Sequence, residues 1–557
     1  MYRSILIIGF FLSACATEET GVSVSVKNEV IGQVPVELFG HFLEKPSWHG
    51  EQGPEAALQP NSYELQEGVV ALMQDMHIPL LRFPGGSDVD YMDWTTMIDT
   101  PGKLKIKGNR PPVAGHKGDM VGANFGYDEA GKLAEELGAS LMLVVNFGDA
   151  YKERKPLQEA AMHEAALLAY CAAPLGADLP GDLEKWPELR AENGHPEPYP
   201  VKYVQIANEP FWLDRGVLKI RGDIPDEKEA HFMTCAEAYI DLFKQVLPGV
   251  KIILDGNCED LVDDMKDRLG NKVDLVAYHR YYPWAIREVK KGEEIISRDS
   301  LTEEEIWNAW VAVPNLDDET GFSVFDDPLY QSAVASGYPV ALTEWNWNGW
   351  WNTDSVDPDN LGSMYIKGIG VAGFLHAMMR AAADGHLALA TQSMLVGNSW
   401  GITGIRVSPS VEFDPHLLPT GQVTAFYANH HGGDMLKVEL AGNEGYEQPY
   451  KMNDLKPEKN VARLDVIATK SKERLFVNIL NRSYSEDLAI SLDLSGFLLK
   501  NNQAVHKTLY GNIDNEDPCS TQPLRYACIN EKERQIIDDQ VAITQPAGTV
   551  GILEIQL

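Results

Sequence analysis

The sequence predicts an α/β fold: a (β/α)8 TIM barrel with a C-terminal antiparallel β-sandwich domain that also takes the N-terminal strand. Three observations support this prediction. Short apolar segments alternate with helical segments over most of the 557-residue chain. After about Ser408 the segments instead alternate apolar and polar residues, and all 12 tryptophans lie earlier, between Trp48 and Trp400. Eight strands that alternate with helices fit a barrel better than a doubly wound sheet.

The first residues resemble a lipoprotein signal peptide, which we place at residues 1–15. Arg3 supplies a positive charge, residues 5–12 are apolar, and the Leu-Ser-Ala-Cys sequence ending at Cys15 resembles a bacterial lipobox. We therefore expect Cys15 to be lipidated and to tether a bacterial outer membrane lipoprotein, facing either the periplasm or the cell surface. The alternative is an ordinary secretory signal with an incidental cysteine.

Residues 22–37 are predicted to form a strand that precedes the barrel. Val22, Val24 and Val26 are apolar, whereas Ser23 and the other residues between them are polar. Such alternation is typical of a half-buried strand. No barrel strand remains to pair with this segment, so we expect it to join the sandwich.

The barrel is predicted over residues 38–408. Its candidate strands are short and apolar, as buried parallel strands are. They are residues 38–42, 79–83, 140–147, 201–208, 250–255, 273–279, 339–345 and 387–392. On this count Glu209 ends the fourth strand and Glu344 the seventh.

The sandwich is predicted over residues 409–557, where segments such as 463–469, 474–480 and 488–494 alternate apolar and polar residues. Cys519 and Cys528 lie nine residues apart in a loop-rich part of this region. In an oxidising compartment they could form a local disulfide.

The chain is strongly acidic, with 82 acidic against 47 basic residues and a net charge of −35. This charge argues against nucleic acid as a partner and against binding to anionic membrane surfaces. It argues only weakly against a polyanionic substrate, because a locally basic cleft can lie on an acidic protein. We expect membrane contact only through the N-terminal lipid.

Two glutamates follow apolar, β-prone runs, Glu209 after residues 201–206 and Glu344 after residues 339–342. Strand ends of a β/α barrel open onto one face, so both carboxylates would point into one pocket. Two carboxyl groups about 5–5.5 Å apart serve retaining glycoside hydrolysis, one as acid/base and one as nucleophile. The amide of Asn208 can donate to a sugar hydroxyl. These residues predict a glycosidase.

Three other motifs are set aside. Residues 368–373 fit G-x-G-x-x-G, but this segment is predicted to be helical and follows no strand of a βαβ unit. The His-Glu pair at 163–164 lacks the second zinc histidine, because Leu167 stands in its place. The histidines and aspartate within 430–434 suit a turn better than a metal site. We expect neither a metal nor a cofactor.

Several further segments match a known family in order along the chain. They are residues 39–44, 78–86, 193–199, 208–209, 278–281, 344–346, Gln392 and 477–482. Together they resemble the α-L-arabinofuranosidases of glycoside hydrolase family 51, from about Val22 to Leu557. The resemblance implies a barrel with a β-sandwich, retention of configuration, no metal and, often, a homo-oligomer.

The resemblance also implies a role for each matching residue. Glu209 is similar to the acid/base of that family and Glu344 to its nucleophile. The substrate-binding residues are Glu44 and Asn208 as ligands of sugar hydroxyls, Gln392 as a further hydroxyl ligand, and Tyr281, whose phenol would hydrogen-bond the nucleophile. The supporting residues are Arg82 beneath the nucleophile and His279 as an orienting group.

The sequence departs from the family pattern near the predicted pocket. Ser87 and Asp88 follow the Pro-Gly-Gly motif where the family has Asn or Cys and then an aromatic residue. Trp347 and Trp350 follow the second glutamate and could stack on sugar rings. We expect an α-L-arabinofuranosidase acting on plant or algal glycans. An endo-glucanase or galactan hydrolase with the same glutamates is the first alternative, and a non-catalytic glycan-binding lipoprotein the second.

Overall fold

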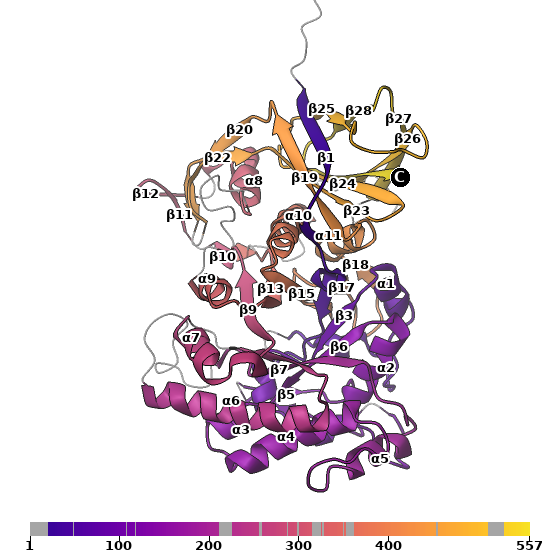
Figure 1. Ribbon diagram of the computed structural model, residues 1–557, viewed down its shortest axis with the longest axis vertical. Coiled ribbons are helices and arrows are strands. Elements are labelled where there is room, and N and C mark those ends of the chain that lie inside the picture. Colours follow the sequence, from indigo (N-terminus) through magenta and orange to yellow (C-terminus); the bar gives the residue numbers. More distant parts are fainter. Residues whose placement is uncertain are drawn as a thin grey trace, which may run out of the picture.

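The structure is a computed structural model that describes most of the chain. It leaves undescribed residues 1–20, 48–49, 107, 117, 211–225, 256–258, 287, 298–299, 315–324, 326–327, 349, 352–360, 453–454 and 511–527. The described residues form a closed eight-stranded barrel and a large C-terminal sheet (Figure 1). The predicted fold class is therefore confirmed.

The barrel consists of parallel strands that pair in chain order and close on themselves. They are β2 (Gly40–Phe42), β3 (Leu80–Phe83), β6 (Ser140–Val145), β7 (Val201–Ile206), β8 (Lys251–Leu254), β9 (Leu275–Tyr281), β13 (Val340–Asn346) and β15 (Leu387–Ser393). Each overlaps a predicted segment and extends at most two residues beyond it, because a buried parallel strand is apolar on both faces.

A helix follows each barrel strand and covers its outer face. These helices are α1 (Val69–Asp75), α2 (Tyr127–Leu137), α4 (Leu157–Ala172), α6 (Asp226–Val246), α7 (Glu259–Arg268), α9 (Pro328–Ala335), α10 (Leu361–Ala383) and α11 (Pro419–Ala428). Shorter helices in the connections are α3 (Gly148–Tyr151), α5 (Lys185–Glu192) and α8 (Glu303–Val311).

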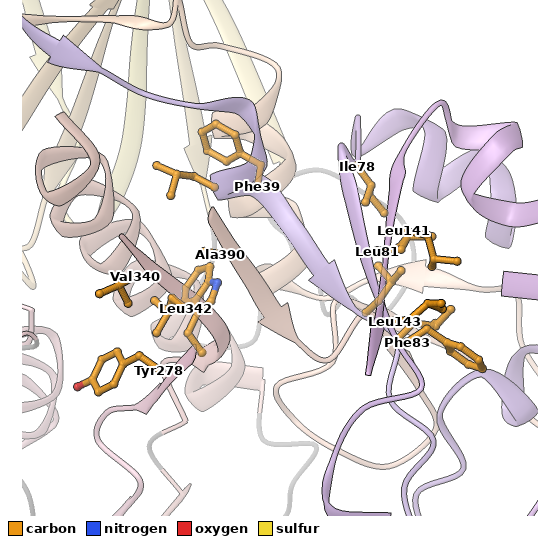
Figure 2. Close-up of a cluster of buried hydrophobic side chains, with 14 of the residues drawn as sticks. Phe39, Ile78, Leu81, Phe83, Leu141, Leu143, Tyr278, Val340, Leu342 and Ala390 are labelled. Carbon is orange, nitrogen blue, oxygen red and sulfur yellow. The ribbon is translucent and has the colours of Figure 1, made fainter. Parts of the chain in front are cut away.

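Alternate residues of the strands fill two different cores. Leu80, Met142, Ile253 and Leu389 belong to a small cluster inside the barrel. Their neighbours along the strands face the helices, and Figure 2 displays several of these outer side chains, including Leu81 beside Leu141. The inner cluster fills the barrel below the strand ends, so polar residues can gather only above it.

The C-terminal sheet has nine strands in the order β27-β26-β29-β24-β23-β19-β1-β25-β28. Their bounds are β1 (Val22–Gln33), β19 (Asp434–Ala441), β23 (Leu464–Lys470), β24 (Arg474–Asn481), β25 (Leu488–Asp493), β26 (Gln503–Tyr510), β27 (Cys528–Gln535), β28 (Gln540–Gln545) and β29 (Thr549–Gln556). The first strand of the chain, indigo in Figure 1, lies among the last ones. It pairs antiparallel with β19 and parallel with β25. The sheet curls, because β28 also approaches β26 and β27.

A buried charge cluster joins the barrel helices to this sheet. Asp465 of β23 accepts hydrogen bonds from Arg380 of α10 and from Arg482, and its carboxylate lies 3.2 Å from Nδ1 of His376. Burial alone would raise the pKa of Asp465, but Arg380 and His376 bring that pKa well below its ordinary value. The carboxylate is thus held ionised where the two parts of the molecule meet.

The predictions for the two ends of the chain fall partly outside the described residues. Cys15 and Cys519 lie outside them, while Cys528 is disulfide-bonded. Cys171 and Cys235 are buried free thiols. Within the described part of the chain, no helix is both long and apolar enough to cross a membrane.

Candidate active site

The two predicted glutamates meet at the carboxyl ends of the barrel strands. Glu344 lies in β13, and Glu209 lies three residues beyond the end of β7. One carboxylate oxygen of each and a ring nitrogen of His279 lie within 4.8 Å of one another. His279 and Tyr281 both point inward from β9, because alternate residues of a strand share a face. All four residues therefore form one site.

Glu344 is held by two hydrogen-bond donors. Nη1 of Arg82 donates to Oε1 at 3.0 Å, and the hydroxyl of Tyr281 donates to Oε2 at 2.9 Å. Arg82 is completely buried, and its guanidinium stacks on the ring of Phe42 at 4.2 Å. Burial and the charge of Glu344 raise the pKa of Tyr281 well above its ordinary value, so the phenol keeps its proton. Both donors stabilise an ionised Glu344.

Glu209 lies in a different setting. Its side chain is 22% exposed, and Oε1 is 3.0 Å from Nδ1 of His279. Its φ of 47° is in the left-handed region, as is that of Ala207 at 65°. Such a backbone is costly for residues other than glycine. Asp255 supports it, because its Oδ2 accepts the backbone N–H of Glu209 at 2.8 Å.

His279 lies between the two glutamates. Its Nδ1 is 3.7 Å from Oε2 of Glu344, and its Nε2 is 3.0 Å from the hydroxyl of Thr343. Burial would lower the pKa of His279, but the charge of Glu344 and the hydrogen bond to Glu209 outweigh it and raise that pKa. A protonated ring can thus balance the charge of both carboxylates.

The spacing of Glu209, His279 and Glu344 would also allow a metal ion. The donors around them argue against one. The guanidinium of Arg82 and the phenol of Tyr281 already occupy both oxygens of Glu344. A bound cation would have to lie beside Arg82 and displace the ring of His279 from Glu209. These residues therefore suit acid/base catalysis by carboxyl groups better than they suit binding of a metal ion.

Asn208 has an amide nitrogen that takes part in no hydrogen bond among the described residues. Nη2 of Arg82 donates to its Oδ1 at 2.5 Å, while Nε of Arg82 donates to Gln205 at 2.8 Å. Asn208 is 1% exposed, and its Nδ2 has no hydrogen-bond partner among the described residues. Because the oxygen is committed to Arg82, the amide nitrogen remains available to a sugar hydroxyl.

Glu44 is a third carboxyl group in the same site. It is buried, and burial together with the charges of Glu344 and Asp88 raises its pKa well above the ordinary value. A Cβ on Gly86 would lie 2.3 Å from Oε1 of Glu44, so only glycine allows this approach. Gly86 also has a φ of 64°, which a side chain would disfavour.

Asp88 is completely buried beside Glu44. Its Oδ1 accepts from the hydroxyl of Ser47 at 2.8 Å and from the backbone N–H of His116 at 2.6 Å, and it is 2.8 Å from Nδ1 of His116. Its Oδ2 has no hydrogen-bond partner among the described residues. Ser87, its neighbour, is also buried.

Gln392 does not lie where the sequence predicted, and this expectation is corrected. Its Oε1 accepts a hydrogen bond from Thr424 of α11 at 2.7 Å. In the strand register it stands beside Trp345, whose ring packs on Phe374 of α10. Gln392 therefore faces the helix layer and not the barrel interior.

The sugar platform proposed for Trp347 is also corrected. Its ring is completely buried, packs 5.6 Å from Trp310 and donates from Nε1 to the carbonyl of Val313. A Cβ on Gly370 would collide with this ring at 2.2 Å. Trp347 is thus a packing residue. The side chain of Trp350 lies outside the described residues.

Sequence reasoning missed several residues that complete the site. Asp255 follows the fifth barrel strand, so its strand-end position was a usable signal. Burial raises the pKa of Asp255 to about 6, although His279 opposes this effect. Thr343, Gln205, Ser47 and His116 carried no such signal, because only the fold brings them together.

An eight-stranded barrel with a close pair of carboxylates at its strand ends has the architecture of a retaining glycoside hydrolase. The comparisons with known proteins agree. Residues 72–293 match the family model described as "Alpha-L-arabinofuranosidase 1 domain". The chain resembles the α-L-arabinofuranosidases of glycoside hydrolase family 51.

Among curated relatives, an intracellular exo-α-(1→5)-L-arabinofuranosidase of Halalkalibacterium halodurans is 23% identical over 275 residues, which are 47% of this chain and 49% of the relative. α-L-Arabinofuranosidase 1 of Arabidopsis thaliana is 28% identical over 38% of this chain and 27% of its own. The chain thus matches about half the length of the first relative and about a quarter of the second.

Solved structures agree over the whole fold. The α-L-arabinofuranosidase of Thermotoga maritima in complex with arabinose has a TM-score of 0.71 at 21% identity, covering 96% of this chain and 100% of that one. The family 51 enzyme AbfB of Bifidobacterium longum has a TM-score of 0.68 at 17% identity, covering 96% and 99%. At these identities the likeness concerns the fold.

Proposed function

We propose that this chain is a retaining α-L-arabinofuranosidase that releases arabinofuranose from plant or algal glycans. The observation that carries the proposal is the approach of Glu209 and Glu344, whose nearest carboxylate oxygens lie within 4.8 Å. Retaining enzymes need about 5–5.5 Å between the two carboxyl groups, whereas inverting enzymes need about 6.5–9.5 Å.

In the proposed first step, Glu344 attacks the anomeric carbon while Glu209 donates its proton to the leaving oxygen. The donors Arg82 and Tyr281 suit the nucleophile, because they favour the ionised form of Glu344. The C–O bond to the leaving group breaks as the bond to Glu344 forms. In the second step, ionised Glu209 takes a proton from water, which attacks the same carbon and frees Glu344.

The hydroxyls of the bound sugar would be held by Glu44 and Asn208. Glu44, with its raised pKa, can donate as a protonated carboxyl group, while the free Nδ2 of Asn208 also donates. His279 acts as a positioning residue: it holds Glu209 and offers a positive charge when Glu209 becomes ionised.

The test is hydrolysis of 4-nitrophenyl α-L-arabinofuranoside by the parent, Glu344→Ala and Glu209→Ala proteins. We expect Glu344→Ala to lose at least about 10³-fold in kcat/KM, and Glu209→Ala to lose mainly kcat, because 4-nitrophenolate leaves without a proton from Glu209. Added azide should restore turnover by Glu344→Ala through one displacement, which gives the β-azide. With Glu209→Ala it should give the α-azide, because the glycosyl-enzyme adds a second displacement.

Full activity of Glu344→Ala would show that Glu344 is not the nucleophile. Retained binding of glycans by both variants, with no hydrolysis by the parent, would instead support a non-catalytic glycan-binding protein.

A second candidate is the same machinery acting on another glycan, as an endo-glucanase or a galactan hydrolase. Asp88 favours it, since a buried carboxylate oxygen without a described partner lies beside Glu44, where the family pattern has an aromatic residue. A panel of nitrophenyl glycosides and a reducing-end assay on polymers separate the two candidates. Turnover of a pyranoside with silence on the arabinofuranoside would favour the second.

For the cellular location, we propose a lipid anchor on Cys15 of a bacterial outer membrane lipoprotein. The lipobox-like sequence before Cys15 supports this proposal. The relatives from Halalkalibacterium halodurans and Bacillus subtilis are named as intracellular enzymes. Detergent phase partitioning of the parent and Cys15→Ala proteins is the test: the parent should enter the detergent phase and the variant the aqueous phase. Aqueous partitioning of both would refute the anchor.

A further inference from the structure

A polar cavity of about 240 Å³ lies in the C-terminal sheet, outside the barrel. The residues that matter for its chemistry are His506, Thr508, Asn530, Lys532, Arg534 and Thr544. The volume of the cavity far exceeds the roughly 10–15 Å³ of such space that a single water needs. This is more room than a bare carboxylate fills, and it suits a single sugar ring.

The cavity lies where the curled sheet brings three of its strands together. His506 pairs directly with Lys532, and Thr508 with Asn530, so these side chains lie on the same face of the β26–β27 hairpin. Nε2 of His506 is 3.0 Å from Oε1 of Gln545 in β28. The hairpin and β28 therefore form facing walls.

A hydrogen-bond network holds His506, one of the lining residues. Gln545 is fully buried, and its Nε2 donates to the hydroxyl of Thr549 at 2.7 Å. Its Oε1 must then accept from Nε2 of His506, which makes that nitrogen the donor. Burial, with the charges of Arg534 and Lys532, lowers the pKa of His506, so its ring is neutral. The network fixes the ring of His506, and Lys532 and Arg534 take no part in it.

Lys532 and Arg534 form no ion pair within the described part of the chain. Nε of Arg534 is buried and has no hydrogen-bond partner there. The nearby acids of the same strand alternate to the other face, where Glu531 lies 3.9 Å from Lys507. The one acidic side chain of the lining, Asp487, accepts the backbone N–H of Ala547 at 2.9 Å. Two unpaired cations in one cavity are notable on a chain with a net charge of −35.

We propose that this cavity is a binding site for a carboxylate-bearing sugar, the uronic acid unit of an acidic glycan. Arg534 and Lys532 bind the carboxylate, because a guanidinium offers paired donors and an ammonium adds a point charge. The side chains of Thr508, Asn530 and Thr544 bind the ring hydroxyls. The site is separate from the catalytic glutamates, so it gives the chain a second hold on a charged polysaccharide.

The test is calorimetric titration of the full-length Glu344→Ala protein with D-galacturonic acid. D-galactose serves as the neutral counterpart, and sodium acetate and sodium sulfate serve as bare anions. We expect galacturonate to bind more tightly than the other three and to weaken as salt is added. Lys532→Ala/Arg534→Ala should weaken galacturonate binding by about 10-fold or more. The matched control, Lys472→Ala/Lys500→Ala, removes two exposed lysines and should bind as the parent does.

Equal binding of galactose and galacturonate, or tighter binding of acetate or sulfate, would overturn the proposal. Absence of measurable galacturonate binding by the Glu344→Ala protein would also overturn the proposal. With Glu344 intact, the Lys532/Arg534 variant should cleave a small nitrophenyl substrate as the parent does, which separates this site from the catalytic one.

Discussion

At the scale of single residues, the two glutamates differ in their surroundings in the way that their proposed roles require. Glu344 is nearly buried and receives hydrogen bonds from Arg82 and Tyr281. Glu209 is partly exposed, and its carboxylate contacts the imidazole of His279. A nucleophile must be ionised, whereas an acid/base must exchange its proton with water and the leaving group. Glu209, the more solvent-exposed glutamate, is therefore the better suited to be the acid/base.

Replacing His279 by glutamine tests how the proton of Glu209 is controlled. The raised pKa of His279 means that its ring is charged over a wider pH range than a free histidine. This charge favours ionised Glu209 and so lowers the pH at which the acid loses its proton. In His279→Gln we expect the alkaline limb of kcat/KM to move to higher pH by about 1 unit, with a lower kcat. An unchanged pH–rate profile would contradict this role.

Replacing Asp88 by asparagine tests the specificity of the pocket. The charge of Asp88 raises the pKa of Glu44, so its removal should let that pKa fall and weaken hydrogen bonding by Glu44 to the sugar. We expect KM to rise about 10-fold or more on the preferred substrate, with a smaller change in kcat. Asp119→Asn, an exposed aspartate of the same region, is the control and should leave both constants unchanged. If Asp88→Asn has the KM of the parent, Asp88 does not influence substrate binding, either directly or through Glu44.

At the scale of elements, the strands could be predicted from the sequence. Which strand residues point into the barrel and which point toward the helices could be predicted only in part. Runs of apolar residues marked all eight barrel strands, and strand ends located Glu209 and Glu344. Gln392 was assigned to the pocket by the family resemblance alone, and in the structure it pairs with His41 of β2 and faces the helix layer. A slip of one residue turns a side chain from the interior to the helices. Nothing in the sequence indicates which of these two positions Gln392 takes.

The same limit applies to the tryptophans. An indole can cover a sugar or fill a core, and its neighbours in the sequence do not distinguish these uses. Trp347 fills a core because Gly370 of α10 leaves room for its ring. That glycine lies 23 positions away in the sequence, so only the packing of α10 against the barrel reveals the match.

The inner cluster of the barrel should contribute strongly to stability. Met142 is completely buried inside the barrel, whereas Met120 is 60% exposed. We expect Met142→Ala to lower the free energy of unfolding by about 2–5 kcal/mol, through lost burial and the cavity left behind. Met120→Ala should change it by less than about 0.5 kcal/mol. Denaturant titration of both variants measures the difference, and equal values would refute the assigned packing.

At the scale of the whole molecule, the charge cluster around Asp465 couples the barrel to the C-terminal sheet. Removing one partner from a buried ion pair leaves the others unpaired, so Asp465→Ala should cost about 3–5 kcal/mol. Glu473→Gln, an exposed change in the same sheet, should cost little. Thermal unfolding of both proteins checks this. A parent-like midpoint in Asp465→Ala would contradict the coupling.

The same cluster predicts a dependence on pH. The pKa of Asp465 is lower in the folded protein than in the unfolded chain, so its contribution is fully present above the unfolded value of about 3.9. That contribution is lost as the pH falls toward the folded pKa. Between pH 5 and pH 3, the parent should therefore lose more stability than Asp465→Ala. Parallel losses in the two proteins would refute the assignment.

The position of β1 has a consequence for how the molecule is made. Its hydrogen-bond partners, β19 and β25, begin more than 400 residues later in the chain. During synthesis the earliest strand must wait, unpaired, until nearly the whole polypeptide has left the ribosome. A protein shortened by its first 33 residues would lose an interior strand of the sheet, not an edge strand. Its C-terminal sheet would be divided, and β19 and β25 would become unpaired edge strands that can pair with other chains and aggregate.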